Sequence, residues 1–150
     1  MTSAKPPKKI KAKFDPYVNS KDVHGLDRHI FHEFLEDKDA ALVMFYDAEE
    51  PECDWAKKHF IRAAKTTERL NHAFAAVNCV KERDTCVQEG SQDVYPFYKL
   101  YSRGNVIDTY RDYRSFMYFT MRRFVENAPL VITHEAPLNP CTQKSYEYDS

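Results

Sequence analysis

The sequence has few of the features that mark several classes of protein. It contains only 3 glycines and 8 prolines among 150 residues, which excludes a collagen-like or low-complexity chain. No apolar run approaches the length of about 18 residues that a membrane-spanning helix needs. The formal net charge is −1, so no excess of one sign favours nucleic acid or an anionic membrane. We therefore expect neither a membrane span nor a nucleic-acid partner.

Cysteine is also scarce. The 4 cysteines, Cys53, Cys79, Cys86 and Cys141, are too few for a small domain built on disulfides, and no two of them have C-x-x-C spacing. The 6 histidines form no H-x-x-x-H pair and no mixed cluster with cysteine. A structural zinc site needs ligands at such spacings, so we predict no metal site and no cofactor.

The two ends of the chain are poor in apolar residues. Residues 1–20 include five lysines between Lys5 and Lys13, which predicts a flexible, basic N-terminal arm in solvent. The start, MTSAKPPKKIKAKF, has no apolar core of a signal peptide, so we expect an intracellular protein or a mature domain from a longer chain. Residues 130–150 are rich in proline and polar residues and predict a loose tail. A single domain is expected between them, over residues 21–129.

This central part is rich in aromatic and aliphatic residues. The chain has 10 phenylalanines, 10 tyrosines and 1 tryptophan, and 43% of its residues are hydrophobic. A chain of this length and composition can bury a packed core. Apolar residues recur at helical spacing over residues 26–35, 56–74, 85–89 and 116–125.

Between the predicted helices lie apolar runs of strand length. They cover residues 40–46 and 74–80, and a hairpin with a turn at Arg103-Gly104-Asn105 is predicted from residues 97–101 and 106–110. Two strands joined by a long helix are parallel, whereas a hairpin is antiparallel. The sequence therefore predicts an α/β fold in the order α-β-α-β-α-β-β-α, with a mixed sheet covered by helices.

Three segments resemble domains of the protein disulfide isomerase family. LVMFYDAEEPECDWAKK, residues 42–58, is similar to the strand, active site and helix written F-Y-A-P-W-C-G-H-C-K. VYPFYKLYSRGNVIDTY, residues 94–110, resembles the G-Y-P-T hairpin, with Tyr95-Pro96 at its cis-proline dipeptide. VNCVKERDTC, residues 77–86, resembles the V-D-C…C segment. The resemblance covers about residues 22–128 and implies a thioredoxin fold.

The active-site residues depart from this pattern. Glu50 stands where the first cysteine belongs and Cys53 where the second belongs, so the site Glu50-Pro51-Glu52-Cys53 is degenerate. Met44 occupies a position where many active members have a buried glutamate. The resemblance implies that oxidoreductase activity needs an exposed thiolate at the first position, which Glu50 cannot supply. We expect no dithiol mechanism, although the family implied is one of disulfide isomerases.

The remaining thiol at this site has acidic neighbours. Five acids lie within eight residues around Cys53: Asp47, Glu49, Glu50, Glu52 and Asp54. Negative charges disfavour a thiolate, while a helix N-terminus favours one. We expect the acids to prevail and the thiol to stay protonated. The same acids, with Pro51 at a first helical position, suit the start of a helix.

The other cysteines allow several arrangements. Cys79 and Cys86 are seven residues apart, which favours a structural disulfide that closes a small loop, the alternative being two free buried thiols. Cys141 in the predicted tail is either unpaired or pairs across chains. His59 is expected on a helix face turned away from Cys53, so no Cys–His nucleophile pair is predicted.

Tyr95, Pro96 and Trp55 are the candidate peptide-binding residues. The resemblance implies a cis bond at Pro96, facing the helix start and leaving the preceding backbone free to pair with an extended peptide. Alternatively, Pro96 only begins a strand. For Trp55, a place in the core is favoured over an exposed aromatic contact, because large apolar residues are mostly buried.

The resemblance implies a redox-inactive thioredoxin-like domain that binds unfolded or partner polypeptide, or that orients neighbouring catalytic thioredoxin domains during protein folding. It implies the endoplasmic reticulum lumen or secretion, which would permit the Cys79–Cys86 disulfide. One alternative is disulfide isomerisation or mixed-disulfide capture by Cys53 alone. Another is a structural or interaction protein that has no peptide groove.

Overall fold

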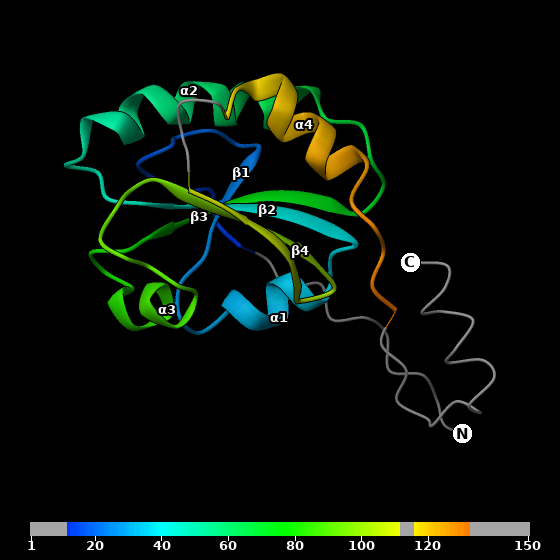
Figure 1. Ribbon diagram of the computed structural model, residues 1–150, viewed down its shortest axis with the longest axis horizontal. Coiled ribbons are helices and arrows are strands. Elements are labelled where there is room, and N and C mark those ends of the chain that lie inside the picture. The colour runs from blue at the N-terminus through cyan, green and yellow to red at the C-terminus, as the bar shows by residue number, and fades with distance from the viewer. Residues whose placement is uncertain (1–11, 112–115, 133–150) are drawn as a thin grey trace.

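The computed structural model describes residues 12–111 and 116–132, which form a five-stranded sheet between two layers of helices (Figure 1). The strands are β1 (Val23–Gly25), β2 (Ala40–Tyr46), β3 (His72–Asn78), β4 (Phe97–Ser102) and β5 (Asn105–Tyr110), in the spatial order β1-β3-β2-β4-β5. β3 is parallel to β1 and β2, whereas β4 is antiparallel to β2 and β5. The sheet is therefore mixed, as the sequence predicts.

Helices cover both faces of this sheet. They are α1 (Phe31–Glu36), α2 (Pro51–Thr66), α3 (Arg83–Gln88) and α4 (Tyr118–Glu126). In Figure 1, α2 and α4 lie over one face, and α1 and α3 lie over the other. All seven residues of β2 are buried, because alternate side chains enter the two cores on opposite faces. Burial on both faces is the reason why β2 reads as a continuous apolar run.

The observed elements differ from the predicted ones mainly at their ends. The long helix ends at Thr66, so the prediction that it continues through Leu70 and Phe74 is wrong. Leu70 is 90% exposed in the connecting loop, and Phe74 lies in β3. Strand β1 was not predicted, because three residues are too few to show a periodic pattern of apolar side chains. The first helix begins at Phe31, later than its apolar spacing predicts.

The domain begins before the predicted boundary at residue 21. Asp15 is buried, and its carboxylate accepts hydrogen bonds from the Tyr46 hydroxyl (3.0 Å) and the Val18 amide (2.9 Å). Val18 joins the core beneath α2, and the Tyr17 ring stacks on Tyr46 with centroids 4.6 Å apart. Residues 12–20 are thus part of the packed domain, and the rest of the predicted arm, residues 1–11, lies outside the described residues.

Contacts also extend beyond the predicted boundary at residue 129. The Val131 amide donates a hydrogen bond to the Ser102 hydroxyl (2.8 Å), which ties the chain after α4 to the end of β4. Residues 133–150, most of the predicted tail, lie outside the described residues.

The packing of residues 12–20 predicts the effect of truncation. A chain that begins at residue 21 should be less stable to unfolding by about 2–4 kcal/mol than one that begins at residue 12, because it loses the burial of Val18 and the Asp15–Tyr46 hydrogen bonds. Urea titration of the two chains measures the difference. Equal stability would contradict the inclusion of this segment in the domain.

Candidate functional site

The carboxyl end of β2 leads directly into α2 through a short acidic loop. The Asp47 carboxylate accepts the Glu49 amide hydrogen (2.9 Å), and the Glu50 amide donates to the Asp47 carbonyl (3.0 Å). Glu50 is the N-cap residue, with extended backbone, and Pro51 opens the helix. Glu52 and Asp54 lie in the first turn, where negative charge interacts favourably with the helix dipole. The junction is built as a helix start.

Cys53 points inward from the first turn of α2. Its side chain is 0% exposed and belongs to the core between α2 and the sheet. Burial raises the pKa of the thiol to about 12; a hydrogen bond with the Asp47 backbone lowers it in part, and the charges of Asp47, Glu50 and Glu52 raise it further. Burial is thus the largest cause, ahead of the acidic cluster on which the sequence argument relied. At neutral pH the thiol is protonated.

Met44 is the residue that stands where the resemblance places a buried glutamate. Met44 is buried and lies opposite Tyr98 in the β2–β4 register. The Tyr98 hydroxyl is buried and has no hydrogen-bond partner among the described residues. An apolar thioether therefore occupies the position where the resemblance places a proton-relaying glutamate.

The N-terminal segment lies beside the start of α2, which the sequence argument missed because it predicted a loose arm. The Tyr17 hydroxyl donates to the Asp54 carboxylate (2.7 Å), and the Lys57 ammonium lies 4.2 Å from the centre of the Tyr17 ring. This hydrogen bond lowers the pKa of Asp54. One of the five predicted acids is therefore engaged by a tyrosine and a lysine.

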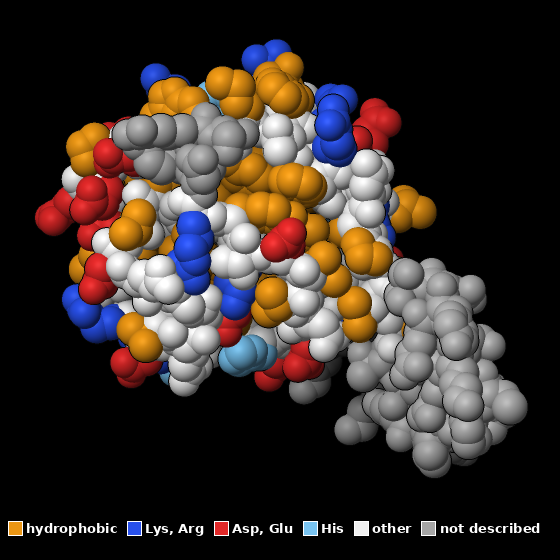
Figure 2. Space-filling view, viewed as in Figure 1, with side chains coloured by type: hydrophobic (Ala, Val, Ile, Leu, Met, Phe, Trp, Pro, Cys, Tyr) orange, Lys and Arg blue, Asp and Glu red, His pale blue; other side chains and the backbone are white. Residues whose placement is uncertain are grey.

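A hollow of about 220 Å³ opens next to this helix start. It lies between the β2–α2 loop, the β3–α3 connection and the loop before β4, and its lining residues are Asp47, Glu50, Cys79, Val80, Arg83, Asp93 and Tyr95. In Figure 2, carboxylates gather at the left edge of the molecule, where α2 begins in Figure 1. Glu50 of the degenerate site and Tyr95 therefore line the same hollow.

Tyr95 precedes a cis peptide bond to Pro96, the geometry that the resemblance implies. Its hydroxyl forms a hydrogen bond with the Ser91 hydroxyl (2.6 Å), which holds the ring. Within the described part of the chain, no hydrogen bond is made by the backbone N–H or C=O of Tyr95. A donor and an acceptor are therefore available beside the hollow.

Trp55 does not join this group. It lies on α2 with its ring centroid 4.4 Å from that of His59, and it does not line the hollow. The prediction of a core position is wrong, since 38% of the residue is exposed. His59 in turn accepts the Tyr118 amide hydrogen (3.3 Å), so it faces the start of α4. Of the three predicted peptide-binding residues, Tyr95 therefore lines the hollow beside Glu50, whereas Pro96 and Trp55 do not line it.

A disulfide supports one wall of the hollow. Cys79 and Cys86 are bonded and close a loop that carries the lining residues Val80 and Arg83. A second tie acts on this loop, because the Glu82 carboxylate accepts hydrogen bonds from the Arg28 amide (2.9 Å) and guanidinium (3.0 Å). Cys141, the remaining cysteine, lies outside the described residues.

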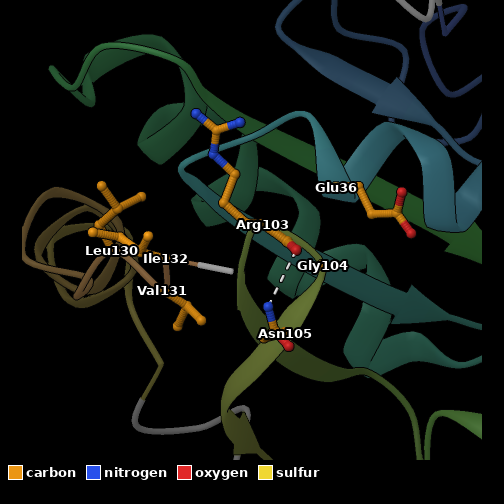
Figure 3. Close-up of a pocket in the computed structure, with 7 residues that line it drawn as sticks. All are labelled: Glu36, Arg103, Gly104, Asn105, Leu130, Val131 and Ile132. Atoms are coloured by element: carbon orange, nitrogen blue, oxygen red, sulfur yellow. Dashed lines mark hydrogen bonds between the residues drawn. The ribbon is translucent and has the colours of Figure 1, made fainter. Parts of the chain in front are cut away.

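A second hollow, of about 580 Å³, lies at the other end of the sheet (Figure 3). It is bounded by Glu36, the hairpin turn at Arg103 and residues 130–132. Because β2 and β4 are antiparallel and Phe97 faces Phe45, this turn lies far from the start of α2. Its lining contains no cysteine, histidine or tyrosine. We therefore place the candidate site at the first hollow.

Residues 12–111 and 116–132 contain no group of three histidine, cysteine or acidic side chains placed to hold a metal ion. Over the same ranges there is no helix with the length and apolar content of a membrane span.

Comparison with known proteins identifies the class of this fold and site. No family model matches the chain. A thioredoxin mutant from Halobacterium salinarum NRC-1 superimposes with a TM-score of 0.63 at 16% identity, over 76% of this chain and 97% of that protein. The mixed sheet with helices on both faces is therefore a thioredoxin fold.

Two curated proteins are similar to this chain in sequence. Protein disulfide-isomerase A5 of Bos taurus is 40% identical over 83 residues, and protein disulfide-isomerase of Arthroderma benhamiae is 31% identical over 99 residues. These matches cover 53% and 66% of this chain but only 16% and 18% of the relatives. The chain is similar to a small part of these protein disulfide-isomerases, which supports a thioredoxin-like domain of that family.

The burial of Cys53 predicts how it reacts with pH. In a Cys141→Ser variant, alkylation of Cys53 by iodoacetamide should accelerate only as the pH nears about 12. In the guanidinium-unfolded chain it should accelerate near the ordinary thiol pKa of about 8.5. Because the folded pKa is the higher one, this group's contribution to stability is complete below about pH 8.5 and declines as the pH rises towards 12. Half-maximal alkylation of the native protein near pH 7 would contradict the assignment.

Removal of the disulfide should weaken the fold. Replacing both Cys79 and Cys86 by serine should lower the free energy of unfolding by about 2–3 kcal/mol, because the unfolded chain loses the constraint of the small loop. Urea titration measures the change. As a control, a reductant should lower the stability of the wild type and leave the double variant unchanged. A variant as stable as the oxidised wild type would count against the disulfide.

Proposed function

We propose that this domain is a redox-inactive member of its family that binds extended polypeptide at the hollow beside Tyr95 and serves as a chaperone-like or scaffolding module in protein folding. One observation carries the proposal: Glu50 occupies the position of the attacking thiol, while Cys53 is fully buried behind it.

Disulfide exchange requires a nucleophile that the start of α2 does not expose. Exchange begins when an exposed thiolate attacks a disulfide sulfur, and a carboxylate cannot replace it. With a pKa of about 12, on the order of one Cys53 side chain in 10⁵ is ionised at pH 7. The same burial argues against the alternative in which Cys53 alone isomerises or captures disulfides.

The surface around the hollow offers backbone and apolar groups to a polypeptide. The Tyr95 backbone offers a donor and an acceptor, and two exposed valines, Val80 and Val94, stand at or next to the lining of the hollow. An extended segment can pair with such a backbone edge through main-chain hydrogen bonds while its side chains contact the apolar rim. This arrangement suits an unfolded or partner polypeptide.

The setting of the domain belongs to the proposal as well. The matched regions of the relatives are a small part of long proteins, which supports a role beside neighbouring catalytic thioredoxin domains. The Cys79–Cys86 disulfide suits an oxidising compartment, so the endoplasmic reticulum lumen or secretion is proposed.

A pair of matched variants tests the binding site. The probe is a fluorescent, end-blocked, neutral peptide, Thr-Val-Tyr-Gln-Val-Thr, and the measurement is fluorescence anisotropy with the full chain. Val80 and Val87 are similarly exposed, at 62% and 61%, but only Val80 lines the hollow. Val80→Lys should weaken binding by about fivefold or more because it removes apolar contact, while Val87→Lys should leave it unchanged.

Two outcomes would contradict the proposal. Equal binding by the wild type and Val80→Lys would show that the hollow takes no part in the interaction. Absence of binding would favour a structural or interaction protein without a peptide groove.

N-methylation of the probe's central amides separates main-chain pairing from side-chain contact. It should abolish binding if the Tyr95 backbone is the partner.

A further inference from the structure

The charges that line the hollow are unbalanced. Three acidic residues, Asp47, Glu50 and Asp93, line it together with one basic residue, Arg83. None of these four groups forms an ion pair within the described residues. Some other acids of the described residues do form ion pairs, as in Glu82–Arg28, Glu89–Lys99, Asp39–Arg103 and Glu126–Arg122. The hollow is therefore a place where uncompensated negative charge collects.

The size of the hollow and its donor atoms restrict what it can hold. At about 220 Å³ it is smaller than the roughly 300–1,000 Å³ of small-molecule pockets, so it suits a single side chain. Its carboxylates are not gathered as metal ligands, since no such group of three occurs among the described residues. A cation on a flexible stem fits this spacing better than a metal ion does.

The rim of the hollow complements such a stem. Val80 and Val94 are 62% and 58% exposed at the hollow and next to it, so they present apolar surface to the solvent. Lysine and arginine place their methylene stems on apolar surface while the charged head reaches polar groups. The available Tyr95 backbone is an independent sign of a peptide, because a paired segment directs alternate side chains to one side.

We propose that the segment bound beside Tyr95 is selected for a lysine or arginine side chain, which enters the hollow and neutralises Asp47, Glu50 and Asp93. This inference rests on the proposed function and deepens it, because it names the class of polypeptide that the site prefers.

The test uses three probes that differ at one residue. The full chain is titrated with the fluorescent peptide carrying Lys, Gln or Glu at its fourth position. The Lys peptide should bind about fivefold to tenfold more tightly than the Gln peptide, and the Glu peptide more weakly than either. Raising the salt concentration from about 0.05 M to about 0.5 M should compress these differences, because screening weakens the interaction between partly exposed charges.

Matched variants test whether the acidic residues of the hollow cause the preference for the Lys peptide. Glu50→Gln combined with Asp93→Asn should bring the ratio of Lys-peptide to Gln-peptide affinity close to one. Glu49→Gln, in the same loop but not lining the hollow, should retain the ratio and so controls for the general acidity of the surface. Thermal melting of each variant checks that it is folded. Loss of the ratio in Glu49→Gln alone would overturn the assignment to the hollow.

The outcomes separate this inference from the proposed function. If all three peptides bind equally well, or the Glu peptide binds best, the basic preference is overturned while polypeptide binding stands. If none of them binds, both fail together. A ratio that depends on Glu50 and Asp93 and falls with salt supports both.

Discussion

The inward packing of the Cys53 side chain is the constraint on which the properties of this site depend. α2 must bury one stripe against the sheet, and Cys53 shares that stripe with Ala56, Phe60 and Ala63. Placing the thiol there gives the helix a well-packed first turn and raises the thiol pKa through burial. The position that would project outward at the helix start carries Glu50 instead. A stable helix start and a thiol with a raised pKa therefore follow from the same packing.

The proposed loss of thiol chemistry does not require a change in the surrounding architecture. The β2–α2 loop, the disulfide-closed loop and Tyr95 still enclose a hollow, and each wall has its own support. Cys79–Cys86 and the Arg28–Glu82 pair hold one wall, while the Ser91 hydroxyl holds the Tyr95 ring. The proposed function therefore treats polypeptide binding and disulfide exchange as separate properties of this fold. The binding surface needs backbone groups, an apolar rim and charge, whereas exchange needs an exposed nucleophile.

Much of the fold could be predicted because its central strands and α2 carry strong periodic signals. β2, buried on both faces, was predicted to the residue. The cis bond between Tyr95 and Pro96 was implied by the resemblance. Three features had no such signal. β1 is three residues long, and the polar spacing around Asp15 and Tyr17 gave no sign of their contacts with Tyr46 and Asp54. The approach of Asp93 and Arg83 to the acidic loop depends on tertiary structure alone.

The absence of thiol–disulfide exchange is the central claim, and turnover tests it directly. The measurement is the rate of insulin disulfide reduction by dithiothreitol, with and without the oxidised full-length chain, followed by the turbidity of the released B chain. The account predicts the uncatalysed rate for the wild type and for Cys53→Ser alike. An acceleration by the wild type that disappears in Cys53→Ser would contradict it.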